Sequence, residues 1–95
     1  MRRLILMRDA SCMASVLGFD HICRDRFGRA HSRTATHLLT IEHVHEGYGM
    51  AGKRAASDPA HLIAVCALIN LRPPTKAMRE AFRLYLARVA AWVAT

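Results

Sequence analysis

The feature that most constrains the fold is a short apolar run, residues 37–44, that ends at a glycine-rich break. Its apolar and β-branched members are Leu38, Leu39, Thr40, Ile41 and Val44. Such residues favour a strand. Three glycines then fall within residues 47–52 and permit tight turns and close backbone approach. We therefore expect a strand here, paired with another strand and packed against a helix.

A helix is expected after the break, from about Pro59 to Asn70. Ser57 or Asp58 can cap its N-terminus, and Pro59 suits the first helical position. The spacing of its apolar residues predicts one buried side. Those residues are Leu62, Ile63, Val65, Cys66 and Ile69.

A second, amphipathic helix is expected from about Lys76 to Val93, with Thr75 as its cap. Residues 72–74, Arg-Pro-Pro, separate it from the first helix. Its apolar stripe has helical spacing and comprises Met78, Phe82, Leu86, Val89 and Val93, widened by Tyr85 and Trp92. Together with the strand, these helices predict a single α+β domain over residues 1–95.

The N-terminal half is less regular. Residues 2–7 are compatible with a short helix or a strand, and Phe19 to Cys23 could form a strand. Residues 24–36 are polar, basic and contain glycine, which is typical of a loop or a hairpin arm. Such a segment could face phosphate or simply be solvated.

The charge balance points to a polyanionic partner. The net charge is +7, and 12 of the 14 basic residues are arginine. Arginine pairs with phosphate at two points, so nucleic acid is favoured over a basic surface with no partner. The candidate phosphate contacts are Arg24, Arg26, Arg29, Arg33, Lys53, Arg54 and Arg72.

Cysteine usage and hydropathy favour a cytoplasmic protein without a membrane anchor. Three cysteines are too few and odd in number for a secreted disulfide framework. The apolar run at residues 4–7 is too short for a secretory signal, and residues 84–94 are too short to span a bilayer.

The chemistry-bearing residues are Glu42 and His43, in the expected strand, and Asn70, 27 residues after His43. A carboxylate, an imidazole and an amide are suited to holding a hard divalent metal and activating a water. A neutral imidazole can accept the proton from that water. A further histidine, His61, lies between His43 and Asn70 in the sequence.

Four segments, in order and spacing, resemble the HNH endonuclease family, and small phage-encoded members look most similar. Residues 8–12 resemble the charged "RD" pair before the family's first cysteine, and residues 39–44 its "LTIDHV" strand. Residues 47–62 resemble its "GG…DPxNL" stretch, and residues 65–76 its "LCxxCN…K" segment. The resemblance implies a ββα-metal core, a β-hairpin plus a helix at about residues 8–72, followed by an added C-terminal helix at about 75–94.

The resemblance implies a role for each candidate. His43 would be the general base, and His61 would support it by a hydrogen bond to the catalytic hairpin. Glu42 and Asn70 would hold Mg²⁺ or a similar ion such as Mn²⁺. Glu42 replaces the usual Asp and His61 the usual central Asn.

The family's zinc knuckle departs further from the pattern. It normally uses two CxxC pairs, but Ser15 and Ile69 occupy the second positions here. Cys12 and Cys66 alone cannot complete a tetrahedral site. Cys23 or His31 could join them, although their spacing does not match the knuckle, so zinc is expected to be absent or weakly bound.

The resulting expectation is a metal-dependent DNA endonuclease that nicks DNA as a monomer, in the host cytoplasm if it is phage-encoded. The alternative is a degenerate HNH fold that binds DNA or a phage protein without cutting. A third reading is a small basic interaction protein with no nucleic-acid partner.

Overall fold

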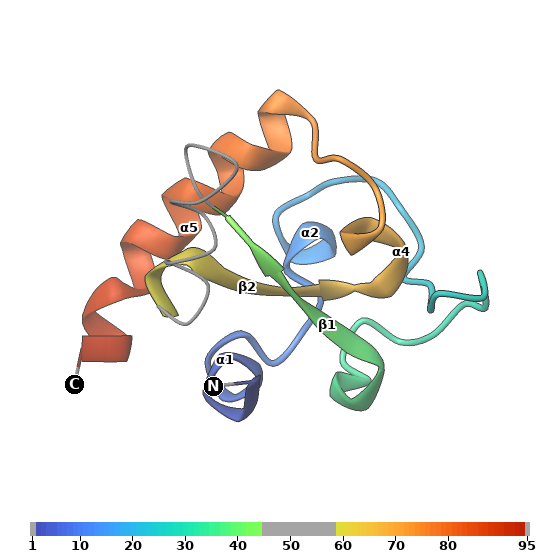
Figure 1. The fold of residues 1–95 in the computed structure, drawn as a ribbon, viewed down its shortest axis with the longest axis horizontal. Helices are drawn as coiled ribbons and strands as arrows, with labels where there is room; N and C mark the ends of the chain where they lie inside the picture. Colours follow the sequence, from blue (N-terminus) through green and yellow to red (C-terminus); the bar gives the residue numbers. More distant parts are fainter. Residues whose placement is uncertain (1, 45–58, 95) are drawn as a thin grey trace.

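A two-stranded antiparallel sheet lies at the centre of the fold (Figure 1). The structure, a computed structural model, describes residues 2–44 and 59–94. Strand β1 (Leu39–His43) pairs with β2 (Leu62–Cys66), so that Ile41 faces Ala64 and His43 faces Leu62. The strand expected within residues 37–44 and its pairing with another strand are thus confirmed, although residues 37 and 38 belong to a 3₁₀ turn that precedes it.

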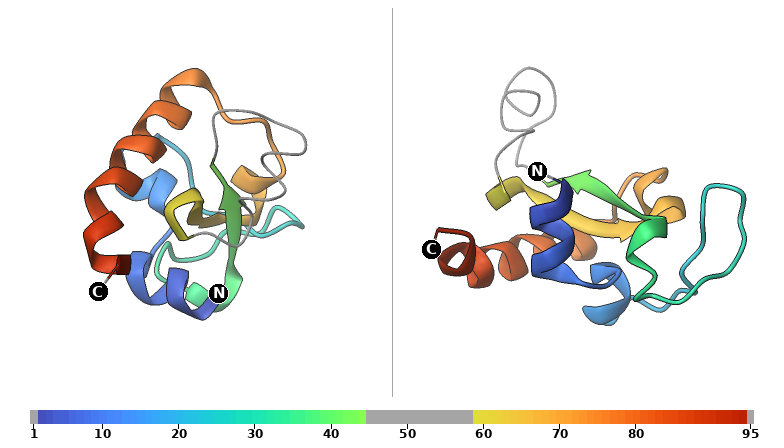
Figure 2. Two further views of the ribbon diagram at one scale, coloured as in Figure 1. Left: turned by 60° about the vertical axis from the view of Figure 1, so that its left-hand side comes forward. Right: turned by 90° about the horizontal axis from the view of Figure 1, so that it is seen from below.

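Helices surround this sheet. Helix α1 (Arg2–Asp9) settles the ambiguity at residues 2–7 in favour of a helix. The remaining helical elements are α2 (Met13–Val16), η1 (Thr36–Leu38), η3 (Pro59–His61), α4 (Ala67–Asn70) and α5 (Lys76–Ala94). Strand β2 contacts α1, α2, α4 and α5. Strand β1 contacts α4, and it lies on the side of β2 that is opposite to α5 (Figure 2). The domain is a small α+β fold.

The prediction of one helix from Pro59 to Asn70 is wrong. That segment forms a 3₁₀ turn, then strand β2, then the four-residue helix α4. All five residues of β2 are buried, and a surface helix could bury only one of its sides. A continuous apolar run with β-branched Ile63 and Val65 suits a strand covered on both faces.

The C-terminal helix agrees with the sequence. The backbone N–H of Met78 donates to Oγ1 of Thr75 over 3.2 Å, as expected of an N-cap. Phe82 and Leu86 of α5 are buried in the core, and the ring of Phe82 meets that of Phe19 edge-on at 6.2 Å. The core otherwise consists of residues from α1, α2 and both strands, together with Cys12, Cys23 and Val44, which lie outside these elements.

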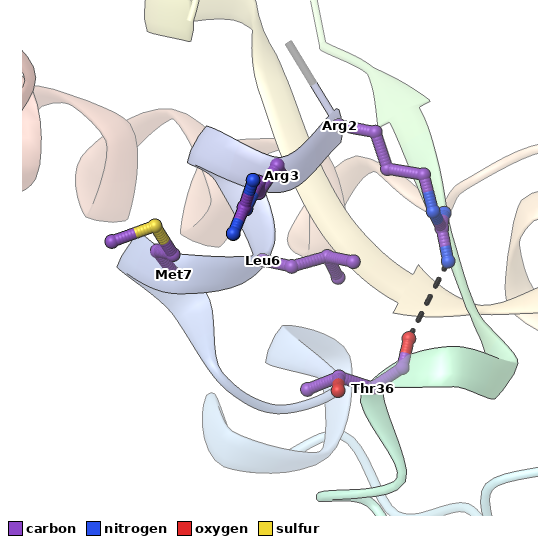
Figure 3. Close-up of a pocket in the computed structure, with 5 residues that line it drawn as sticks. All are labelled: Arg2, Arg3, Leu6, Met7 and Thr36. Carbon is purple, nitrogen blue, oxygen red and sulfur yellow. Dashed lines mark hydrogen bonds between the residues drawn. The ribbon is translucent and has the colours of Figure 1, made fainter.

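Helix α1 is tied to the start of β1 through Arg2. Its guanidinium donates to the carbonyl oxygen of Thr36 over 3.4 Å (Figure 3) and to the carbonyl oxygen of Leu39 over 2.8 Å. Arg2 and Thr36 thereby close one side of a shallow hollow that Leu6 and Met7 also line. This arginine is committed to the fold rather than free for a ligand.

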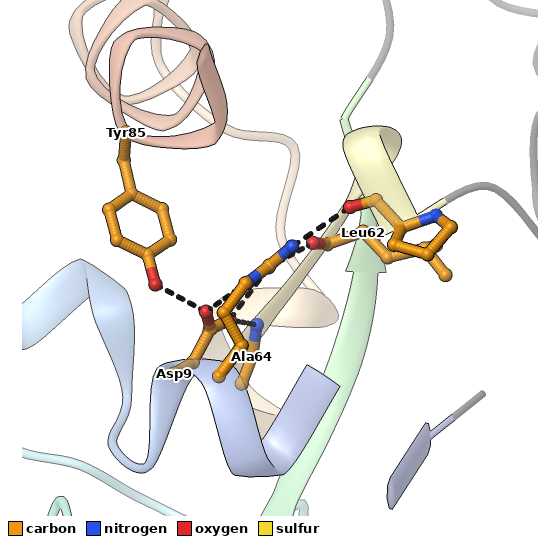
Figure 4. Close-up of polar contacts among 6 residues, drawn as sticks. Asp9, Leu62, Ala64 and Tyr85 are labelled. Carbon is orange, nitrogen blue, oxygen red and sulfur yellow. Dashed lines mark hydrogen bonds and ion pairs between the residues drawn. The ribbon is translucent and has the colours of Figure 1, made fainter. Parts of the chain in front are cut away.

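A buried ion pair satisfies the edge of β2 that faces away from β1 (Figure 4). Arg8 bonds to the carboxylate of Asp9 and donates to the carbonyl oxygens of Pro59 and Leu62. The same carboxylate accepts the backbone N–H of Ala64, over 2.8 Å, and the hydroxyl of Tyr85. The charged pair at residues 8–9 therefore joins α1, β2 and α5, and it covers an edge that would otherwise be unpaired.

One further expectation is wrong, and others fall on residues that the structure does not describe. Phe19 to Cys23 forms no strand; the nearby pairing is a single bridge between Arg24 and Ala30. The glycine-rich break, Lys53, Arg54 and the cap residues Ser57 and Asp58 lie outside the described residues. None of the helices in the described ranges has the length and apolar character needed to cross a membrane.

Candidate metal centre and catalytic pocket

Three cysteines and one histidine converge between α2 and the end of β2. They are Cys12, His21, Cys23 and Cys66, and their potential ligand atoms all lie within 4.8 Å of one another. The three thiols are buried and the imidazole is half-buried. Thiolates and a neutral imidazole are typical ligands of structural zinc. The cluster could therefore hold a metal ion, and its donor set suits zinc.

The distances from His21 to two of the sulfurs match those of a tetrahedral centre. Zinc bonds of about 2.3 Å to sulfur and about 2.05 Å to nitrogen place the nitrogen about 3.6 Å from each sulfur. Nε2 of His21 lies 3.7 Å from Sγ of Cys12 and 3.7 Å from Sγ of Cys66. Nδ1 of His21 lies 3.0 Å from the carbonyl oxygen of Phe19 and can donate to it. That bond leaves the Nε2 lone pair facing the sulfurs.

The cysteines are electrostatically unequal. The thiol of Cys12 donates a hydrogen bond to the sulfur of Cys66, which lowers the pKa of Cys66 and raises the pKa of Cys12. Burial raises the pKa of Cys23. One sulfur is therefore ready to bind metal as a thiolate, while a zinc ion would displace the protons of the other two.

The cluster joins segments that are distant in sequence. Cys12 precedes α2, and its backbone N–H donates to the carbonyl oxygen of Arg33 over 2.8 Å. Cys66 ends β2 and directly precedes α4, and its N–H donates to Sγ of Cys12 over 3.3 Å. A metal here would fasten the loop after α2 to the junction of β2 and α4.

The expectation of absent or weakly bound zinc started from two ligand positions, Cys12 and Cys66, whereas four potential ligands cluster in the fold. Cys23 or His31 was expected as a possible further ligand despite its spacing, and His21 was not expected. In the fold, His21 and Cys23 complete the set and His31 stays outside it. The signal available in the sequence was the His-x-Cys spacing of residues 21–23.

A second site lies between strand β1 and the end of α4. Glu42 and His43 of β1 and Asn70 of α4 line one open pocket of about 390 Å³. The remaining lining residues are Leu71, Arg72, Pro73 and Pro74. The strand and the short helix thus bring together the three residues that the sequence selected, although they are up to 28 positions apart.

Glu42 is unusual for a carboxylate, since it is only 6% exposed. Burial raises its pKa to about 7. Its Oε2 atom is buried without a hydrogen-bond partner in the described parts of the chain. An unsatisfied buried carboxylate oxygen is costly unless a cation or a donor reaches it.

Asn70 is fixed against the strand. Its Nδ2 donates to Oγ1 of Thr40 over 3.1 Å and to the carbonyl oxygen of Ile41 over 3.2 Å. Both donor hydrogens of the amide are used in this way, so its carbonyl oxygen is the atom that could bind a cation. His43, by contrast, is exposed at the pocket, where water can reach the imidazole.

Of the other predicted residues that the structure describes, Arg72 alone also lines this pocket. His61 is in η3, not in a helix of its own, and its Nδ1 lies 3.2 Å from the carbonyl oxygen of Val44. Arg72 is exposed and lines the pocket. Residues 24–30, here called the arm, carry Arg24, Arg26 and Arg29, and Arg33 follows them. The carbonyl oxygen of Arg24 accepts the N–H of Leu68 over 3.3 Å, which sets the base of the arm against α4.

No family model, no curated protein and no solved structure matches this chain.

Proposed function

We propose that this chain is a metal-dependent DNA endonuclease of the HNH type, built on a zinc-stabilised scaffold. The observation that carries the proposal is the shared pocket of Glu42, His43 and Asn70, in which a buried carboxylate oxygen has no partner in the described residues. Neither the core nor the sheet needs a carboxylate at that position. A divalent cation would satisfy it.

The donor set favours a hard cation such as Mg²⁺ or Mn²⁺. The carboxylate of Glu42 and the carbonyl oxygen of Asn70 are both oxygen ligands, which these ions prefer. A bound cation would also favour the ionised form of Glu42, whose pKa burial raises to about 7. The ion would supply charge stabilisation for the scissile phosphate and the leaving oxygen.

His43 is the residue suited to act as the general base. Its imidazole is exposed at the pocket and can accept a proton from the attacking water. His61 is suited to a positioning role, because its contact with the carbonyl oxygen of Val44 fixes the chain directly after His43. Arg72, on the same pocket, is placed to bind the phosphate.

The order of elements supports the HNH type. Strand β1, strand β2 and helix α4 follow one another as a ββα-metal core requires. The proposed zinc ligands Cys12 and Cys66 stand at the two cysteine positions of the resemblance that remain. His21 and Cys23 would replace the missing second pair from a different part of the chain.

A second candidate is a zinc-stabilised module that binds DNA without cutting it. The exposed fraction of Glu42, 6%, favours this alternative, since so buried a carboxylate offers little room for a hydrated ion. Both candidates predict DNA binding that weakens steeply with salt. Each phosphate contact adds nearly one unit to the log–log salt slope on duplex DNA.

Nicking of supercoiled plasmid by zinc-loaded protein separates the two candidates. With Mg²⁺ or Mn²⁺, the wild type should nick the plasmid, and Glu42→Gln should abolish turnover while keeping DNA affinity. Glu80→Gln, at an exposed position of α5, makes the same charge change and should behave as the wild type. An inactive wild type with clean DNA binding would favour the second candidate.

A further inference from the structure

A single aromatic ring is exposed at the tip of the arm. Phe27 is 72% exposed, the highest fraction among the large exposed hydrophobic side chains of the described residues. In two different views the arm projects away from the sheet and helices (Figure 1; Figure 2). One exposed apolar side chain alone needs no explanation. The surroundings of this ring give it a specific character.

The arm is ordered by its own hydrogen bonds. The carboxylate of Asp25 accepts the N–H of Phe27 over 2.8 Å and the N–H of Arg29 over 3.0 Å. The backbone N–H of Asp25 in turn donates to the carbonyl oxygen of Arg29 over 2.9 Å, and the guanidinium of Arg24 donates to that of Gly28. Gly28 has a φ of 81°, a conformation that suits glycine in a tight turn. The ring is therefore held out by a defined turn.

The base of the arm is fastened to the metal centre. The N–H of His31 donates to the carbonyl oxygen of Cys23 over 2.9 Å, directly beside a proposed zinc ligand. A metal bound by Cys23 would thus fix the point from which the arm extends.

Two guanidinium groups flank the ring. The Cζ atoms of Arg26 and Arg29 lie 5.1 and 5.9 Å from the centroid of Phe27. The only acidic group of the arm, Asp25, is occupied by backbone donors, and the N–H of Arg29 lowers its pKa. The charge of Arg29 also helps to lower the pKa of Asp25, but neither Arg26 nor Arg29 forms a salt bridge with that carboxylate. The tip therefore presents an aromatic surface beside two cations.

We propose that the tip of the arm binds single-stranded DNA, with Phe27 stacking on an unpaired base while Arg26 and Arg29 contact the adjacent phosphates. Aromatic platforms beside basic side chains are how proteins hold single strands, because every base has a π-face and every nucleotide a phosphate. In an intact duplex the bases are already stacked, so the ring gains little there. This inference rests on the proposed function for its nucleic-acid partner, and it narrows the substrate to DNA with an unpaired segment.

The test measures binding, so that it stands apart from cleavage. Fluorescence anisotropy would measure the affinity of zinc-loaded Glu42→Gln protein for a single-stranded oligonucleotide and for the corresponding duplex. The buffer would contain neither Mg²⁺ nor EGTA. Adding Phe27→Ala should weaken single-strand binding about 5- to 150-fold, the range for losing one base–aromatic stack. Duplex binding should change less than about twofold, because it rests on phosphate contacts.

Matched variants control for nonspecific effects. Phe27→Trp should keep the single-strand affinity that Phe27→Ala loses. Leu84→Ala, at a similarly exposed apolar position of α5, should change neither the single-strand nor the duplex affinity. A 5-iodouracil oligonucleotide should cross-link to Phe27. An equal loss on both DNA forms, or no loss on either, would overturn the proposal. A third outcome would also overturn it: Phe27→Ala abolishes binding of polyglutamate and leaves the affinity for the oligonucleotide unchanged. The tip would then recognise an acidic protein surface.

The nuclease proposal and the arm proposal can fail independently, and the measurements distinguish the two cases. If the wild type never nicks DNA but Phe27→Ala still removes single-strand preference, the arm is a recognition element of a binding module. If the wild type nicks DNA and Phe27→Ala changes neither affinity, the nuclease proposal remains and the arm inference is wrong.

Discussion

Replacing Cys23 with serine should remove tightly bound zinc and much of the domain's stability. Cys23 is the informative choice because the sequence pattern points to Cys12 and Cys66, whereas the structure adds Cys23 to the cluster. Its loss leaves three ligands and opens the centre to water, which is the arrangement of catalytic rather than structural zinc.

The expected magnitude follows from binding linkage. At free zinc about 1,000 times the dissociation constant, a ligand that binds only the folded state stabilises it by about 4 kcal/mol. A domain of this size has a total stability of about 5–14 kcal/mol. Its melting temperature shifts about 4–8 °C per kcal/mol, so the loss of zinc should lower the melting temperature by about 15–30 °C.

Elemental analysis and thermal unfolding monitored by circular dichroism provide the measurements. The wild type should contain one zinc per chain and Cys23→Ser much less. All three cysteines of the chain belong to the cluster, so chelation serves as the matched control. In excess EDTA, wild type and Cys23→Ser should melt within a few degrees of each other. A wild type free of zinc, or a Cys23→Ser protein with unchanged zinc and melting temperature, would refute the metal centre.

Three further outcomes follow from particular contacts. Tyr85→Phe should cost about 1.5–3 kcal/mol in urea unfolding, because the hydroxyl donates to the buried carboxylate of Asp9; no loss would mean that water or another group replaces it. Ala10→Gly should stabilise the protein by about 1 kcal/mol, since Ala10 has a φ of 58°; a destabilised variant would contradict that backbone geometry. Without divalent metal, the raised pKa of Glu42 makes the folded state bind more protons than the unfolded state. Stability should therefore fall as pH rises from about 4.5 to 7, by up to about 1.4 kcal/mol per unit, and Glu42→Gln should flatten this dependence in pH-dependent urea unfolding; an identical slope in the variant would exclude this carboxylate as its source.

The sequence was sufficient for elements whose periodicity or caps are local. Strand β1 follows from β-branched and apolar residues, and α5 from its stripe and the Thr75 cap. It failed at β2, where the apolar residues between Leu62 and Cys66 fit a helical spacing as well as a buried strand. Only the tertiary environment, with α1, α2, α4 and α5 all in contact with this segment, decides between the two.

The two sites differ in how much of each could be predicted from the sequence. Glu42, His43 and Asn70 were selected together, and one pocket includes all three. The full metal centre was not predicted because two of its four candidate ligands, His21 and Cys23, come from the loop after α2, which has no periodic pattern to place it. The convergence of His21 and Cys23 with Cys12 depends on long-range contacts such as the hydrogen bond between Cys12 and Arg33.

The most direct test of the nuclease proposal is single-turnover nicking by zinc-loaded His43→Ala protein in Mg²⁺. The base acts on water in the transition state, whereas DNA affinity rests mainly on arginine contacts. We expect the nicking rate to fall about 10²–10⁴-fold with DNA affinity within about twofold of wild type, and His37→Ala, an exposed histidine before β1, to leave the rate unchanged. A nicking rate that survives in His43→Ala would contradict the assignment of this pocket as the active site.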